Sequence, residues 1–215
     1  MKNLLIALLF VFGFTQAQNN QKDKFSVKYP KGVYYTHQDL MSKKPNKEYK
    51  LVADKRSTAA MKRYGGNEYI LRALNFDVPE KQLRNRFYAF STGDELFING
   101  LKHKLQPWYF KILSDGKYFV FRSGIPTNAN SDSRQMQIAN AKAPVGGRLS
   151  GPVLATLRFL YIMDKNTQEI KVIDKRSLPT LLESTPDLLA KYNKETDNNS
   201  PDILLKYLLE FNKLD

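Results

Sequence analysis

The chain has 215 residues, of which 42% are apolar and 26% are charged, and it contains no cysteine. This composition fits one folded domain and excludes a multi-span membrane protein, a wholly disordered chain, a disulfide scaffold and thiol chemistry. The formal net charge is +13, and the excess of basic over acidic residues lies near the N-terminus. Residues 22–63 contain 12 Lys and Arg but 4 Asp and Glu, whereas residues 177–215 contain 4 Lys and Arg but 7 Asp and Glu.

Residues 1–17 have the pattern of a secretory signal peptide. Lys2 supplies positive charge, and an apolar stretch of 11 residues starts at Leu4. That length suits a signal peptide and is too short to span a bilayer. We expect cleavage between Ala17 and Gln18, export to the periplasm or outside of a Gram-negative-type bacterium, and no transmembrane span in the mature chain. A lipoprotein anchor would need a cysteine. The alternative is a buried N-terminal helix.

The segment that follows is polar and leads into the expected folded domain. Residues 18–31 predict a flexible basic lead, which leaves a single domain over residues 32–215. Thr36 and Asp39 have capping-box spacing and predict a short helix that ends before Pro45. The pattern of residues 58–63 favours neither a helix nor a strand. Short strands are predicted at residues 33–35, 48–53 and 69–76.

The middle of the chain predicts two β-hairpins. Their strands are expected at residues 86–90 with 96–99, and at 108–113 with 118–122. The second pair flanks Asp115-Gly116, a strong hairpin turn dipeptide. A two-residue turn would place Ile112 opposite Phe119 and Phe110 opposite Phe121, with these side chains in a core. The other face would pair Tyr109 with Arg122 as an exposed cation–π contact.

The second half of the chain predicts irregular structure, two strands and then helices. Residues 124–154 are polar and end in a loop rich in Gly and Pro. Residues 157–163 are apolar at nearly every position, which is typical of a central strand covered on both faces, and residues 169–173 predict its return. Helices are predicted to begin near Pro179, Pro186 and Pro201. The order indicates an α+β fold: a mostly antiparallel sheet built from hairpins, followed by two or three C-terminal helices.

The sequence holds no motif that points to a known reaction. Its glycine-rich loop lacks the Lys-Ser/Thr of a phosphate loop, and Ser150 lacks the spacing of a nucleophile elbow. The two histidines, His37 and His103, are interpreted as surface residues rather than as a catalytic base or as metal ligands. No catalytic residue, cofactor or metal is predicted.

Two classes of function fit these observations. The first is an exported, non-catalytic binding or interaction module, whose basic surface attracts an anionic envelope polymer or lipid head groups and not nucleic acid. The second is an envelope hydrolase with a carboxylate acid/base pair. The charge is also consistent with a merely solvated surface. Candidate binding residues are Tyr109, Arg122, Arg148, Lys43 and Lys44.

Several short motifs resemble a family of small exported bacterial proteins whose function is unknown. They include Gly32-Val33-Tyr34, Gly65-Gly66-Asn67-x-Tyr69, Ser114-Asp115-Gly116-Lys117-Tyr118 and Thr185-Pro186-Asp187-Leu188. The resemblance covers most of residues 30–215. It implies export and brings no catalytic residue.

Overall fold

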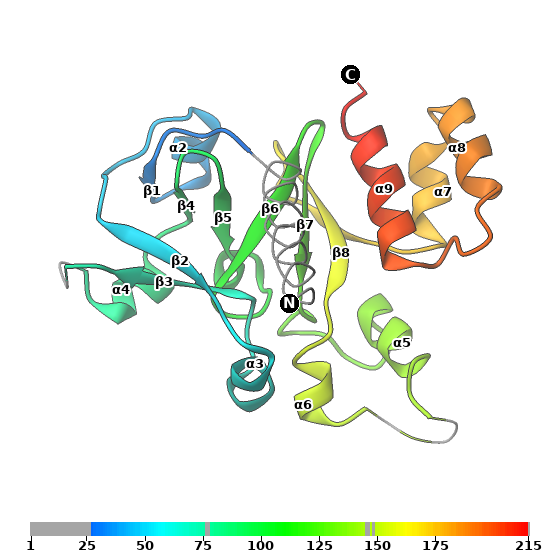
Figure 1. Cartoon of the computed structure of the whole chain (residues 1–215), viewed down its shortest axis with the longest axis horizontal. Coiled ribbons are helices and arrows are strands. Elements are labelled where there is room, and N and C mark those ends of the chain that lie inside the picture. The colour runs from blue at the N-terminus through cyan, green and yellow to red at the C-terminus, as the bar shows by residue number, and fades with distance from the viewer. Residues whose placement is uncertain (1–26, 76–77, 145–146, 148, 215) are drawn as a thin grey trace, which may run out of the picture.

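The computed structural model describes residues 27–75, 78–144, 147 and 149–214 (Figure 1). Within these ranges the chain forms a nine-stranded antiparallel sheet and eight α-helices. The strands pair in the order β1-β4-β5-β6-β7-β8-β9, while β3 pairs with both β6 and β2. The predicted α+β class, with helices at the C-terminal end, is confirmed. The predicted signal peptide and its cleavage site lie outside the described residues.

The bounds of the elements follow the sequence pattern in most places. The strands are β1 (Gly32–Tyr34), β2 (Leu51–Lys55), β3 (Tyr69–Ala73), β4 (Ala89–Ser91), β5 (Leu96–Asn99), β6 (Tyr109–Asp115), β7 (Tyr118–Ser123), β8 (Phe159–Asp164) and β9 (Ile170–Ile173). The helices are α2 (His37–Met41), α3 (Thr58–Tyr64), α4 (Glu80–Asn85), α5 (Arg134–Asn140), α6 (Gly151–Leu154), α7 (Ser177–Leu182), α8 (Pro186–Asn193) and α9 (Pro201–Phe211), with a 3₁₀ turn, η1 (Gly100–His103).

The strand β8 is buried on both faces, as its apolar run predicts. Its odd-numbered residues, among them Tyr161, join a cluster with Phe110 and Phe121. The ring of Phe121 lies 4.0 Å from that of Phe110 and 5.4 Å from that of Tyr161. Its even-numbered residues, Leu160 and Ile162, face a second cluster formed with α7, α8 and α9. Figure 1 shows these three helices together at one end of the molecule.

The β6–β7 hairpin keeps its predicted faces but not its predicted register. Ile112 lies opposite Phe121, and Asp115 lies opposite Phe119, with an irregularity between Ile112 and Ser114. The predicted pairing, which assumed a two-residue turn without a bulge, is therefore wrong. The aromatic face is unaffected, because the net shift at Ile112 is two residues, which returns each side chain to the same face.

The C-terminal helices begin close to the predicted prolines. Pro186 and Pro201 each stand in the first turn of their helix, where the missing N–H is not needed. Thr185 precedes α8, but its hydroxyl donates to the carbonyl of Leu182 (3.0 Å) instead of accepting from the helix. Within residues 124–154, expected to be irregular, the structure has α5 and α6, and α4 is a further unpredicted helix.

The N-terminal part of the described chain is packed rather than loose. Thr36 and Asp39 form the predicted capping box at α2. Val27 and Tyr29 are 4% and 5% exposed, and the amide of Val27 donates to the carbonyl of Asp94 (2.9 Å). The end of the segment expected to be a flexible lead is thus part of the fold. In the described residues, no helix has the length and apolar character needed to cross a membrane.

Candidate functional site

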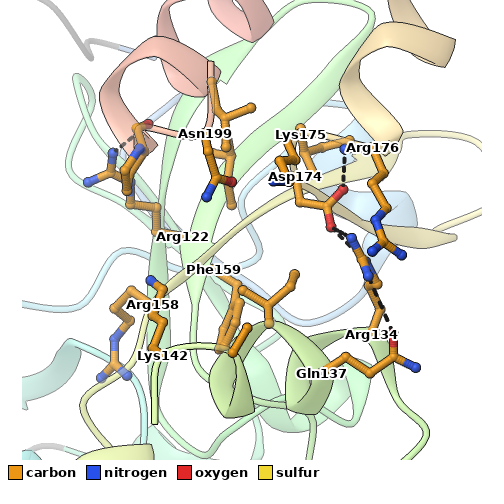
Figure 2. Close-up of a pocket in the computed structure, with 16 residues that line it drawn as sticks. Arg122, Arg134, Gln137, Lys142, Arg158, Phe159, Asp174, Lys175, Arg176 and Asn199 are labelled. Atoms are coloured by element: carbon orange, nitrogen blue, oxygen red, sulfur yellow. Dashed lines mark hydrogen bonds and ion pairs between the residues drawn. The ribbon is translucent and has the colours of Figure 1, made fainter. Parts of the chain in front are cut away.

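A cavity of about 550 Å³ opens between α5, the strands β8 and β9 and the start of α9 (Figure 2). Of the residues that the structure describes, Asp174 is the one carboxylate that lines it. We call it the basic pocket, because six cationic side chains line it: Arg122, Arg134, Lys142, Arg158, Lys175 and Arg176. The apolar lining consists of Ile138, Ala141, Phe159, Leu160, Ile173, Pro201 and Leu204; Gln137 and Asn199 complete it.

Arg122 reaches the pocket from the end of β7. Since Phe121 belongs to the first cluster and Val120 to the second, alternation along the strand puts Arg122 on the side of α9. Its guanidinium lies 3.4 Å from the Pro201 carbonyl and 3.5 Å from an Asp202 carboxylate oxygen. Because the Asp202 side chain is 93% exposed, solvent weakens this ion pair. Arg122 therefore keeps most of its charge available.

Arg134 and Asp174 form a fixed ion pair on one wall. Asp174 Oδ1 accepts from the backbone amides of Arg176 (2.9 Å) and Ser177 (3.0 Å), and Oδ2 accepts from Arg134 Nε (2.6 Å). Burial raises the pKa of this carboxyl, but those amides and the Arg134 guanidinium outweigh burial and hold the pKa below its ordinary value. The pair joins α5 to the start of α7 and neutralises one cation of the pocket.

Arg158 lines the pocket with its stem and turns its charged end away, as Figure 2 shows. One guanidinium nitrogen donates to the carbonyls of Leu157 (2.8 Å) and Ala155 (3.0 Å), and the other donates to that of Gly66 (2.9 Å). Burial lowers the pKa of this guanidinium. Its hydrogen bonds thus support the loop around Gly66 rather than the pocket opening.

The remaining cations of the pocket have no anionic partner. Lys142, Lys175 and Arg176 are exposed, and no carboxylate of the described residues lies within ion-pair distance of them. Together with Arg122 they leave four cations available around one cavity. Guanidinium and ammonium groups around a cavity can bind the carboxylate, sulfate or phosphate group of a ligand.

The structure separates the candidate binding residues that the sequence suggested. Arg122 lines the basic pocket. Tyr109 is fully buried in the core and its hydroxyl donates to the Leu83 carbonyl (2.5 Å), so the predicted exposed pair with Arg122 is wrong. Lys43 lies over the ring of Tyr29 (4.9 Å) near α2, and neither Lys43 nor Lys44 lines the pocket. Arg148, Ala17 and Gln18 lie outside the described residues.

The sequence reasoning missed five of the six pocket cations: Arg134, Lys142, Arg158, Lys175 and Arg176. Arg134 and Lys142 belong to α5 and the turn after it, a segment predicted to be irregular. Lys175 and Arg176 follow Asp174, the first residue after the strand β9. A basic pair just beyond a strand end was the available indication. Residues this far apart in the chain are brought together by the fold alone.

The two histidines form a separate polar group with Tyr88. His37 Nε2 lies 2.7 Å from the Lys165 carbonyl, to which it donates, and Nδ1 lies 2.9 Å from the Tyr88 hydroxyl. The His103 ring packs 5.4 Å from that of Tyr88, and its Nε2 is buried without a hydrogen-bond partner among the described residues. Burial, and then the neighbouring His37, lower the pKa of His103 to about 4.

This histidine group corrects one prediction, since neither ring is a freely exposed surface residue. It also offers no metal site: in the described ranges, no group of three or more His, Asp or Glu side chains is arranged to hold an ion. The basic pocket is therefore the cavity whose residues suggest ligand binding.

Comparisons with known proteins support the family but add no activity. No curated protein and no solved structure is detectably similar to the chain. The model of one family, described as a family of unknown function (DUF6563), matches residues 32–215. That match includes every strand of the described sheet and all the residues that line the basic pocket. The chain therefore belongs to the DUF6563 family, a family of unknown function.

Proposed function

We propose that the protein is an exported, non-catalytic binding module that takes an anionic group of an envelope component into the basic pocket. The observation that carries the proposal is that four available cations, Arg122, Lys142, Lys175 and Arg176, line one cavity. Like charges placed together repel one another, and a bound anion removes that repulsion. An anionic ligand is the partner that this arrangement favours.

The location of these cations sharpens the argument from charge. The excess of +8 in residues 22–63 first suggested an anionic partner, yet none of the lining residues of the pocket comes from that segment. The N-terminal excess is thus spread over other surfaces. The pocket draws its charge from residues 122–176, which three different parts of the sheet and α5 bring together.

The pocket does not favour a hydrolase with two carboxylates. Among the described residues, Asp174 is the single carboxylate that lines it, and the groups around Asp174 hold its pKa below the ordinary value. A general acid needs a raised pKa, and glycosidase chemistry needs a second carboxylate across the cavity. Asp174 instead fixes Arg134 and the first turn of α7.

A pair of matched double variants tests the proposal. Lys175→Gln/Arg176→Gln removes two charges from the pocket, and Lys191→Gln/Lys194→Gln removes two from the exposed surface of α8. The probes are a heparin tetrasaccharide and phosphatidylglycerol vesicles, each titrated across a salt series. We expect binding at low salt that weakens as salt rises.

The pocket double variant should bind about 10-fold more weakly, equivalent to about 1.4 kcal/mol, and the α8 double variant should bind as the unmodified chain does. Equal losses in the two variants would mean a diffuse surface effect. Absence of binding to any anion at low salt would refute the proposal.

A further inference from the structure

The distribution of polarity within the basic pocket narrows the ligand to one class. We infer that the pocket takes an amphipathic anion, in which a sulfate-, phosphate- or carboxylate-type head group is joined to an apolar chain. The inference rests on the proposed function and goes beyond it by naming the apolar part. It is carried by the contrast between the floor of the pocket and its rim.

The floor of the pocket is apolar. Phe159 and Leu160 come from the start of β8, Ile173 from the end of β9 and Leu204 from α9, and each is between 5% and 7% exposed. Ile138 of α5 adds a partly buried face. In Figure 2, Phe159 lies between α5 and the side chains that come from the α9 side. Water over such a surface is displaced favourably by hydrocarbon, whereas a sugar or an inorganic anion gains little there.

The available charge lies at the rim. Lys142, Lys175 and Arg176 are exposed, and the Arg122 side chain is 35% exposed. The cations nearer the floor are already occupied, because Arg134 is paired with Asp174 and the Arg158 guanidinium is turned to backbone carbonyls. A ligand would therefore meet positive charge at the opening and hydrocarbon below it.

The size and shape of the pocket agree with this class. A cavity of about 550 Å³ falls in the range of pockets that enclose most of a small organic ligand. A polymer segment would have to pass over the rim and leave the floor uncovered. An amphipathic anion covers the floor and neutralises the rim with one molecule.

Two sources could supply such a ligand: a monomeric amphiphile in solution or an anionic lipid in a bilayer. The recognition chemistry is the same, and the experiment has an arm for each. The first arm is calorimetric titration with alkyl sulfates from butyl to decyl, each below its micelle concentration. Inorganic sulfate serves as the head group alone and octyl maltoside as an uncharged chain. The second arm is sedimentation with phosphatidylglycerol vesicles.

We expect affinity to rise about fourfold for each added methylene until the pocket is filled, because burial of one methylene contributes about 0.8 kcal/mol. Octyl maltoside and inorganic sulfate should bind far more weakly than octyl sulfate. The Lys175→Gln/Arg176→Gln variant should weaken every alkyl sulfate by a similar factor. Ile138→Thr should reduce the gain per methylene and leave the binding of inorganic sulfate unchanged.

The outcomes separate this inference from the proposed function. If anions bind through the pocket cations with an affinity that does not depend on chain length, the amphipathic class is overturned and the proposed function stands. If neither inorganic sulfate nor any alkyl sulfate binds at low salt, both fall. The affinity could instead rise steeply with alkyl length and be the same in the Lys175→Gln/Arg176→Gln variant. The alkyl sulfate would then bind outside the basic pocket, which would overturn the inference. If Ile138→Thr does not fold, the alkyl sulfate titrations of the unmodified protein still show whether affinity depends on alkyl length.

Either result of the vesicle arm supports an amphipathic ligand and identifies its source. Vesicle binding that the pocket variant loses indicates a lipid taken from a bilayer. Alkyl sulfate binding without vesicle binding indicates a monomeric amphiphile.

Discussion

Asn212 connects the end of α9 to the β6–β7 hairpin, and Asn212→Ala should cost a large share of the stability. The side chain belongs to a residue that is 1% exposed. Its Oδ1 accepts from the Tyr118 amide (2.8 Å), and its Nδ2 donates to Ser114 Oγ (2.9 Å) and to the Tyr118 carbonyl (3.0 Å). Alanine would leave both backbone groups of Tyr118 without these partners. At about 1 kcal/mol for each lost bond, the free energy of unfolding should fall by about 2–3 kcal/mol.

Urea unfolding measured by tryptophan fluorescence and by circular dichroism gives this difference directly. The midpoint should fall while the slope with urea concentration stays the same. Ser114→Ala is the control, because it removes one of the three bonds and should cost about 1 kcal/mol. The double variant should cost less than the sum of the two single variants. A loss below about 0.5 kcal/mol in Asn212→Ala would refute the view that this contact holds α9 to the hairpin.

Three further predictions concern the fold and its response to pH. In Gly116→Ala the new Cβ would lie 1.6 Å from the carbonyl oxygen of Asn212, so the free energy of unfolding should fall by more than about 2 kcal/mol. Gly151→Ala is the control: a Cβ there has nothing within 4 Å, and the denaturation midpoint should change little. Because His103 is neutral in the folded chain down to about pH 4 but ionises near 6.5 when unfolded, stability should fall by up to about 3 kcal/mol as pH drops from 6.5 to 4. His103→Phe should flatten that part of a stability–pH curve, and an unchanged curve would exclude His103 as its cause. Asp174→Ala removes the acceptor that Arg134 and the first turn of α7 share, so the free energy of unfolding should fall by about 2–4 kcal/mol and the thermal midpoint with it. A midpoint equal to that of the unmodified protein would contradict this account.

The sequence predicts the faces of the strands better than their pairing. Alternation decides which side of a sheet a residue occupies, so Phe110 and Phe121 were placed together correctly, and they stack at 4.0 Å. Register depends on the turn and on bulges, which leave a weaker mark in the residues. The irregularity between Ile112 and Ser114 carries no distinctive residue type. Tyr109 lies on the face opposite Phe110, as alternation predicts, but that face is covered by a further cluster that includes Leu83 and Phe87.

The candidate site was harder to predict, because it depends on segments with weak patterns. Ser133 precedes α5 as its N-cap, but its side chain makes no capping hydrogen bond and the first turn has no acidic residue, so the start pattern is weak. It becomes a helix by packing Ala139 and Ile138 against the first cluster. Once α5 is placed, Lys142 comes to the same cavity as Lys175. Arg122 could be predicted as a binding residue, but only its exposure was correctly argued, since its expected partner lies in the core.

The short motifs that suggested a family from the sequence explain the fold rather than the ligand. Asn67 is fully buried; its Nδ2 donates to the Gln106 carbonyl (2.7 Å), and its Oδ1 accepts from Ser123 Oγ (2.7 Å). Gly66 has a φ of +90°, and a Cβ there would lie 2.7 Å from the ring of Trp108. Gly116 makes the equivalent close approach to α9.

None of the residues in these motifs lines the basic pocket. Substitutions in the motifs should therefore act first on stability, because they break packing and buried hydrogen bonds. Substitutions at Lys175 or Arg176, whose side chains are exposed and unpaired among the described residues, should leave unfolding nearly unchanged and act on binding. A shared fold consequently implies no shared ligand; under the proposed function, the side chains at these rim positions decide which anion the pocket takes.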